Sequence, residues 1–361
     1  MFRNASCIYS EARIRTEWIL EVMMSRTLLI SVLLVLIMIT ASCAKRNTAY
    51  ADGNHLELIK TIPVIGNPSH ISVGGDWVYV ALDQGGLGVV NTQNYSYKWL
   101  TSLTSADGSV TQLTRIRLVD SVPNRDILYI YDTSGTDDIS FISTSVSDSL
   151  KPFGSIRGAS QNIQDMIWNN LEADPESNIV ELLYSTSTEV YYGRNDGGFW
   201  MGSDFNIPVA YPIQGLGMDD NNIYVAVDQR GLFTYSRASQ QLLSEISFYG
   251  YAQNMAVHDN IVYVAARHGG LQIVDVNSPQ NPQLIAGYDT SGYASNVEYH
   301  DGKVAVSSGS GGVYLFDVNT PANPKLLAHI TDCGYANTVT FADEKLVVAS
   351  RDEGILFYEI N

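Results

Sequence analysis

The chain has 361 residues, of which 38 are acidic and 21 basic, and 45% of its residues are apolar while only 16% are charged. The net charge of −17 argues against nucleic acid as a partner, because phosphate recognition requires a basic surface. The apolar fraction excludes wholesale disorder, and 22 tyrosines with 29 glycines indicate strands and turns instead of a helical bundle.

The N-terminal region has the pattern of an export signal. Residues 28–39 are apolar except for Ser31, and this run is shorter than the about 20 apolar residues that a spanning helix needs. Three glutamates in the preceding segment do not belong in the n-region of a signal peptide. We therefore expect translation to begin at Met23 or Met24, and we interpret residues 1–22 as a mis-assigned start region.

The apolar run is followed by Ala41-Ser42-Cys43, which resembles the bacterial lipobox, a motif whose cysteine is acylated and becomes the new N-terminus. The resemblance implies a lipoprotein signal peptide over residues 23–42, lipidation at Cys43 and a flexible tether over residues 43–54. An ordinary cleaved signal is the alternative. Because Ala44 is not an aspartate, the resemblance to sorting rules of Gram-negative lipoproteins implies an exported protein, lipid-anchored to the bacterial outer membrane and facing either the periplasm or the surface.

The C-terminal third repeats with a period of 42 residues, as the glycines at 250, 292 and 334 show. Each unit contains four short strand patterns separated by turn residues such as Gly269-Gly270. One small sheet cannot bury both of its faces and must stack radially on copies of itself. The sequence therefore predicts an all-β fold, a seven-bladed β-propeller of four-stranded antiparallel blades over residues 55–361.

The earlier blades diverge from this pattern. Strands are predicted there over residues 78–81, 128–131, 139–142 and 223–226. In the third blade, residues 179–184 and 190–192 are both strand candidates, and residues 169–178 have the composition of an insertion.

The last repeat contains only three strands, the third over residues 354–360. Residues 55–62 resemble the outer strand 325–330 of the preceding unit, so we expect this N-terminal segment to pair into the last blade. Such pairing closes the ring and removes open sheet edges.

The segment from Gly269 to Pro279 resembles the LVIVD repeat, a propeller repeat of bacterial and archaeal surface proteins, and residues 311–321 repeat it. In the first blade only residues 86–91 retain part of the motif, and in the second and third blades the match to the motif is poor. The resemblance implies a surface propeller without an established activity, so it supports the fold and the location and leaves the function open.

Motifs of catalysis and metal binding are absent: the chain has no phosphate-binding glycine loop, zinc-binding helix, nucleophile elbow or calcium loop. His258 and His300 occupy equivalent turn positions, which favours a structural role over metal ligation. We interpret Cys333 as a small buried side chain. The sequence predicts no catalytic residue, no cofactor and no metal site.

Four arginines are predicted at the turns between the second and third strands of their blades. They are Arg194, Arg230, Arg267 and Arg351. A positive collar of this kind suits a carboxylate, a phosphate or an acidic sugar, because arginine offers a planar fork of donors to paired oxygens. The alternative is that acidic residues of the same turns, such as Asp228 and Asp352, pair with the arginines on a solvated rim.

The same rim is predicted to carry one tyrosine per repeat and a polar residue at the start of several innermost strands. The candidates are Tyr251, Tyr293, Tyr335, His70, Asn254 and Asn296. Tyrosine rings stack, and amides donate and accept hydrogen bonds, which suits carbohydrate or peptide recognition. A role in spacing the blades is the alternative.

These observations favour a lipid-anchored cell-envelope propeller that binds a protein, a peptide or a glycan without turnover. A first rival is an enzyme acting on extracellular polysaccharide, a lyase or hydrolase, with Asp83, Asp228, Arg267 and His268 as candidates. It would require ionisable side chains that converge in the central cavity with perturbed pKa values. A second rival is an envelope-assembly scaffold, similar to propeller lipoproteins of outer-membrane biogenesis, which predicts a stable membrane-protein partner.

Overall fold

Short runs of valine, isoleucine and tyrosine, bounded by glycine and aspartate turns, form strands wherever the structure describes the chain. This computed structural model describes residues 55–122, 125–133, 138–145, 150–156, 162–170, 179–196 and 199–361. Within those ranges a single 3₁₀ turn, η1 (Asp228–Arg230), is the one helical element. The predicted start region, the signal peptide, Cys43 and the tether lie outside the described residues.

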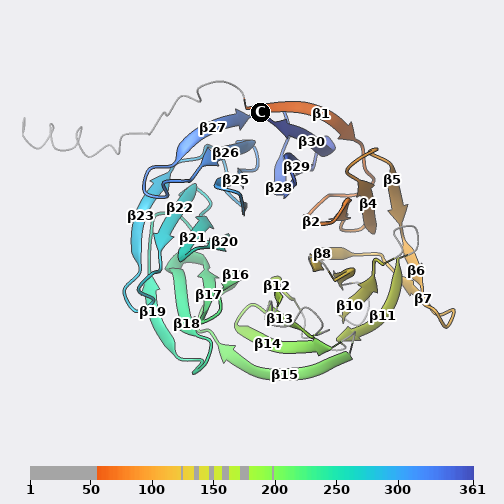
Figure 1. Ribbon diagram of the computed structural model, residues 1–361, viewed down its shortest axis with the longest axis horizontal. Coiled ribbons are helices and arrows are strands. Elements are labelled where there is room, and N and C mark those ends of the chain that lie inside the picture. Colours follow the sequence, from red (N-terminus) through yellow and green to blue (C-terminus); the bar gives the residue numbers. More distant parts are fainter. Residues whose placement is uncertain are drawn as a thin grey trace, which may run out of the picture. The chain divides into compact units, whose positions relative to one another are not determined.

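The strands form seven four-stranded antiparallel sheets arranged in a ring, which confirms the predicted propeller (Figure 1). Blade 1 consists of β2 (His70–Gly74), β3 (Trp77–Ala81), β4 (Leu87–Asn91) and β5 (Tyr97–Leu100). Blade 2 consists of β8 (Ile116–Val122), β9 (Ile127–Asp132), β10 (Asp138–Ser143) and β11 (Lys151–Ile156). Blade 3 consists of β12 (Asp165–Asn170), β13 (Ile179–Ser185), β14 (Glu189–Asp196) and β15 (Phe199–Pro208).

The remaining blades follow the same order from the centre of the ring outward. Blade 4 consists of β16 (Ile213–Met218), β17 (Asn222–Val227), β18 (Gly231–Ser236) and β19 (Leu242–Ile246). Blade 5 consists of β20 (Asn254–His258), β21 (Ile261–Ala265), β22 (Leu271–Asp275) and β23 (Gln283–Tyr288). Blade 6 consists of β24 (Asn296–His300), β25 (Lys303–Ser307), β26 (Val313–Asp317) and β27 (Lys325–Ile330). A small hairpin of β6 (Ser102–Thr104) and β7 (Val110–Gln112), which the sequence did not predict, joins blades 1 and 2.

Blade 7 is completed by the N-terminal strand, as predicted. It consists of β28 (Ala336–Ala342), β29 (Lys345–Ser350), β30 (Gly354–Ile360) and β1 (Leu56–Ile62). β1 pairs antiparallel with β30, so that Leu56 lies opposite Ile360 and Ile62 opposite Ile355. The outer position of this blade is therefore filled by a segment about 300 residues away in the sequence, and no open edge is left at the junction of the ring.

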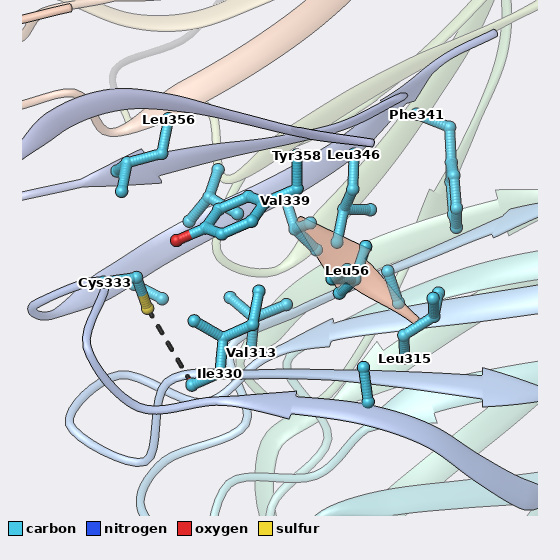
Figure 2. Close-up of a cluster of buried hydrophobic side chains, with 14 residues drawn as sticks. Leu56, Val313, Leu315, Ile330, Cys333, Val339, Phe341, Leu346, Leu356 and Tyr358 are labelled. Atoms are coloured by element: carbon cyan, nitrogen blue, oxygen red, sulfur yellow. Dashed lines mark hydrogen bonds between the residues drawn. The ribbon is translucent and has the colours of Figure 1, made fainter. Parts of the chain in front are cut away.

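Apolar side chains fill the spaces between neighbouring blades. Figure 2 shows one such cluster, in which Leu56 of β1 lies with Leu315 of blade 6 and Leu346 of blade 7. Leu56 is only 3% exposed, whereas Leu58 on the same strand is 50% exposed. Burial of one face of each strand against the next blade is what holds the ring together.

The double glycines of the repeats are required by the backbone. Gly270 has a φ of +68°, and a Cβ atom at this position would lie 2.2 Å from the carbonyl oxygen of Tyr288. Gly312, one repeat later, has a φ of +80° and would place a Cβ atom 1.8 Å from the carbonyl oxygen of Ile330. The turn and the outer strand approach too closely for any side chain, which explains the glycine at each position.

Blade 3 departs from the sequence interpretation in one respect. Both strand candidates form, as β13 and β14, but the turn between them lies at residues 186–188. Arg194 therefore lies inside β14, opposite Glu181 of β13, and not in a turn between the second and third strands. The error arose because Gly197-Gly198 was equated with the glycine pair of the clean repeats, whereas in this blade the pair follows the third strand.

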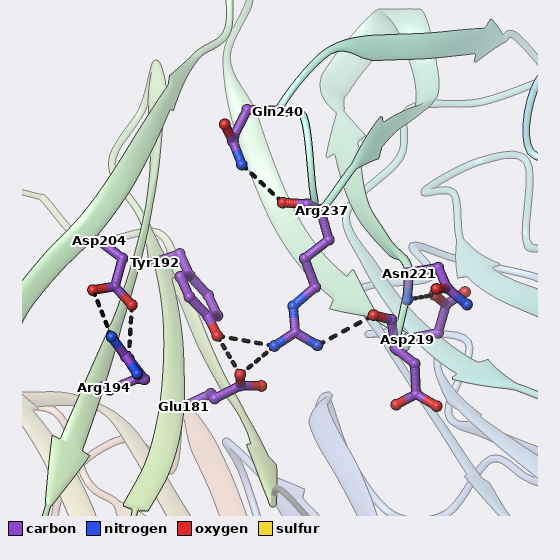
Figure 3. A network of polar contacts seen from close by, with 9 residues as sticks. Glu181, Tyr192, Arg194, Asp204, Asp219, Asn221, Arg237 and Gln240 are labelled. Atoms are coloured by element: carbon purple, nitrogen blue, oxygen red, sulfur yellow. Dashed lines mark hydrogen bonds and ion pairs between the residues drawn. The ribbon is translucent and has the colours of Figure 1, made fainter.

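A buried charge network joins blades 3 and 4 (Figure 3). The guanidinium of Arg237, directly after β18, forms an ion pair with Glu181 and donates a hydrogen bond to Tyr192 Oη at 2.9 Å. Tyr192 Oη in turn donates to the Glu181 carboxylate. The side chains of Arg237 and Glu181 are 15% and 4% exposed. Nearby, Arg194 and Asp204 form an exposed ion pair at 2.8 Å.

Candidate functional site

The functional candidates gather at one end of the ring, which we call the top rim. It is formed by the loops that lead into the innermost strands and by the turns between the second and third strands of each blade. Backbone bridges join the turn of one blade to the loop of the next, such as that between Arg267 and Ala294. Such bridges hold the side chains of adjacent blades in fixed relative positions.

Arg267 lies between two tyrosine rings. Its guanidinium carbon is 5.4 Å from the centre of the Tyr251 ring and 5.3 Å from that of Tyr293. The same guanidinium forms an ion pair with Asp228 of blade 4 at 3.4 Å. Cation–π contacts with two rings and an ion pair with a carboxylate restrict the position of the arginine and offset its charge.

The two other rim arginines repeat this arrangement in simpler form. Arg230 lies over Tyr211 at 4.6 Å and forms an ion pair with Glu245 at 2.7 Å. Arg351 lies over Tyr335 at 4.3 Å and contacts Asp352 at 3.4 Å.

Each predicted collar arginine of the top rim is thus already paired with a carboxylate and an aromatic ring. The residues predicted for this rim do meet there, as Arg–Tyr contacts, and the arginines do not form an uncompensated positive collar.

His70, Asn254 and Asn296 each begin an innermost strand, as expected. Asn254 Oδ1 accepts a hydrogen bond from Val297 N at 3.2 Å, and Asn296 Oδ1 accepts one from Val339 N at 2.9 Å. Both amides therefore bind the backbone of the next blade. Among the described residues, the buried Nδ1 of His70 has no hydrogen-bond partner, and burial lowers the pKa of the imidazole to about 4, against an opposing backbone hydrogen bond.

Asp165 holds the equivalent position in blade 3 and was missed by the sequence interpretation. It begins β12, and its two carboxylate oxygens accept hydrogen bonds from Leu216 N at 2.8 Å and Met166 N at 2.9 Å. Burial raises its pKa to about 7 despite these two bonds. An aspartate at the start of an innermost strand was the available signal, but blade 3 could not be aligned with the repeat.

Two more carboxyl groups lie on innermost strands near the axis of the ring. Burial raises the pKa of Asp120 on β8 to about 7, although Ser72 Oγ donates a hydrogen bond to it at 2.9 Å. Burial raises the pKa of Glu298 on β24 to about 8, and the charges of Asp120 and Asp165 add to the shift. The pKa values of three carboxyl groups on the innermost strands of blades 2, 3 and 6 are thus raised by burial.

The four enzyme candidates named from the sequence do not gather there. Asp228 and Arg267 pair with each other, and the ring of His268 meets the edge of Tyr293 at 5.9 Å. Asp83 lines a separate hollow of the top rim together with Arg115 and Arg117. The sequence interpretation did not single out these two arginines, although their alternation around Ile116 was visible.

The described residues were also compared with the requirements of a metal site and of a membrane-spanning helix. Within the described ranges, no three His, Cys, Asp or Glu side chains come close enough to hold a metal ion. The described ranges also contain no helix with the length and apolar character needed to cross a membrane. Cys333 is a buried free thiol, and burial raises its pKa to about 11.

Comparison with protein families identifies the repeat. The LVIVD repeat model matches residues 65–101, which contain blade 1, and residues 249–290, which contain blade 5. The second stretch includes the motif from Gly269 to Pro279, and the first includes the segment in which the motif had decayed. A search among curated proteins found no match.

Solved structures of similar fold share little sequence with this chain. The crystal structure of the computationally designed Ika8 protein has a TM-score of 0.59 and 12% identity, covering 85% of this chain and 100% of its own. A chain of the mitotic checkpoint complex has a TM-score of 0.64 and 11% identity, covering 88% of this chain and 94% of its own. At such identities the likeness concerns the fold alone. The matched repeats and the seven sheets of the ring together identify the chain as a β-propeller that carries LVIVD repeats.

Proposed function

We propose that this propeller is a non-catalytic binding module of the bacterial cell envelope, held at the outer membrane by a lipid on Cys43, and that it binds a protein or peptide partner on its top rim. The observation that carries the proposal is the Tyr–Arg patch, a set of tyrosines and arginines on the top-rim loops of blades 4 to 6. The patch consists of Tyr211, Arg230, Tyr249, Tyr251, Arg267 and Tyr293.

The chemistry of the patch suits a polypeptide. Tyrosine and arginine are the residues most enriched at protein interfaces, because each combines a large rigid contact area with hydrogen-bonding groups. Tyr249 is 76% exposed, and Tyr251 and Tyr211 are 39% and 37% exposed. Because the arginines are already stacked and ion-paired, little side-chain entropy is lost when a partner binds. This preorganisation favours a protein or peptide over a simple anion.

Site-specific photo-crosslinking in intact cells tests the proposal. A photoreactive amino acid in place of Tyr249 on the top rim is compared with one in place of Asp259, which lies at the opposite end of the same blade with a side chain 87% exposed. We expect a discrete crosslinked partner from position 249 only. Crosslinks of equal yield and pattern from both positions, or none from either, would contradict a partner site on the top rim.

The anchor is tested in the same cells. The Cys43→Ser chain is expected to lose fatty-acid labelling and to leave the membrane fraction, and the crosslink from position 249 should weaken because the partner is concentrated at the membrane. Retention of both the label and the membrane location would exclude lipidation at Cys43.

A second candidate, a propeller enzyme acting on polysaccharide, is favoured by Asp120 and Glu298. Glycoside hydrolysis commonly uses two carboxyl groups, one of which must hold a proton near neutral pH, and burial of these two provides that property. Turnover of a polysaccharide by the intact chain, abolished in Glu298→Gln, would favour this function over a binding module.

A further inference from the structure

The innermost strand of blade 2 begins with an alternation of two arginines around a buried isoleucine. Ile116 is fully buried and bridges to Asp83 of blade 1, whereas Arg115 and Arg117 are exposed. Both arginines line the same hollow, Arg115 directly before β8 and Arg117 at the β-bulge between Ile116 and Leu118. Their backbone is fixed, since Thr133 N donates to Arg115 O at 3.0 Å.

These arginines line a hollow of the top rim of about 460 Å³, formed by loops of blades 1, 2 and 3. Every residue of its wall is polar or charged, and the wall includes Ser69, Asp83 and Asn162. A polar wall binds a hydrophilic ligand through several hydrogen bonds and has little apolar surface to contact an apolar ligand.

The guanidinium groups of Arg115 and Arg117 differ from those of Arg230, Arg267 and Arg351 in having no ion-pair partner among the described residues. Among the described residues, neither guanidinium forms an ion pair or a hydrogen bond, whereas Arg230, Arg267 and Arg351 each contact a carboxylate. Even Asp83, in the same wall, forms no ion pair with them. Two arginines that line one hollow and form no ion pair among the described residues can offer their donors to an anion.

The composition of the wall narrows the class of anion. The Asp83 carboxylate would repel a phosphate dianion more strongly than a singly charged carboxylate, and it can accept a hydrogen bond from a sugar hydroxyl. The Ser69 hydroxyl and the Asn162 amide provide further partners for hydroxyl groups. We propose that this hollow binds a carboxylated sugar residue, with Arg115 and Arg117 holding the carboxylate and the polar wall holding the hydroxyls.

The site lies over blades 1 to 3, apart from the Tyr–Arg patch of blades 4 to 6, so it adds a second ligand to the function proposed above. It is tested by titrating D-glucuronate into the intact chain in detergent micelles, followed by saturation-transfer NMR, with D-glucose and inorganic phosphate as comparison ligands. We expect saturable binding of glucuronate and at least about tenfold weaker binding in Arg115→Gln/Arg117→Gln, as loss of charged hydrogen bonds predicts.

Two further variants make the result specific. Arg194→Gln/Lys325→Gln removes two positive charges outside the hollow and is expected to bind glucuronate as the unmodified chain does. Arg115→Lys/Arg117→Lys keeps the charge but loses the planar fork, and its affinity should fall between those of the glutamine variant and the unmodified chain. Equal melting temperatures will show that the ring is intact.

No saturable binding of glucuronate to the unmodified chain would overturn the proposal. Binding of glucose or phosphate as strong as that of glucuronate would overturn the assigned class of ligand, and an equal loss in the two glutamine variants would overturn the site. None of these outcomes bears on the crosslink from Tyr249, so the two proposals fail independently.

Discussion

The carboxyl group of Glu298, on the innermost strand β24, has no hydrogen-bond partner among the described residues. Burial raises its pKa to about 8, and Asp120 and Asp165, whose pKa values are both raised to about 7, add repulsion. In the unfolded chain these groups titrate near their ordinary values. Between those values and neutrality the folded protein therefore holds protons that the unfolded chain has lost.

The consequence is a stability that falls with rising pH. Protonation of the buried acids in the folded state contributes stability that is fully present below pH about 4 and is lost as the pH rises through about 7 to 8. We expect Glu298→Gln to be more stable than the unmodified chain at pH 9 and to show a shallower pH dependence in urea unfolding.

The matched control is Glu57→Gln, the same change on the exposed face of β1. Its pH dependence should equal that of the unmodified chain. A Glu298→Gln profile that parallels the unmodified chain from pH 5 to 9 would contradict burial as the cause of the raised pKa.

The place of a residue on the rim could be predicted only where the turns of its blade were recognised in the sequence. His70, Asn254 and Asn296 were found because each begins an innermost strand at a fixed offset from a turn. Arg117 of blade 2 and Asp165 of blade 3 lie on comparable innermost strands, but in these two blades the repeat period is broken. The sequence also could not show that the rim arginines are compensated, because Arg230 pairs with Glu245 of an outer strand and not with a turn residue.

At the scale of the elements, the largely apolar contact between blades 3 and 4 includes the buried ion pair of Glu181 and Arg237. Removing one partner of such a pair leaves the other charge without compensation, so we expect Glu181→Ala to lower the free energy of unfolding by about 3 kcal/mol. Chemical denaturation of the purified chain measures this change.

The control variant is Asp204→Ala, which removes the partner of Arg194 in the exposed ion pair (Figure 3). This change should alter stability little, since exposed ion pairs contribute little. If the two variants lose the same stability, the network of Arg237 does not join the blades. The Glu181 contact was not predictable, since both blades lack the clean repeat and the contact crosses between them.

For the whole molecule, closure of the ring was predictable because the last repeat lacked one strand and residues 55–62 carried its pattern. The faces of that strand allow a direct test. Leu56 is buried between blades 6 and 7, and Leu56→Asp should lower the free energy of unfolding by about 3 kcal/mol or more and release an edge that promotes oligomers.

Leu58→Asp is the corresponding change at an exposed position of β1 and should leave the chain monodisperse and nearly as stable. Unfolding curves and light scattering of the two variants measure both effects. Oligomers formed equally by both variants would show that β1 does not protect the edge of β30.

The pairing of β1 with β30 also sets an order in time. Among the strands of the ring, β1 leaves the ribosome first and β30 last, so blade 7 cannot be completed until every other blade has been synthesised. Until then β1 has no strand to pair with, and the ring stays open. Blade 7 therefore stays incomplete throughout synthesis, and the ring closes in one late step, when β30 is available to pair with β1.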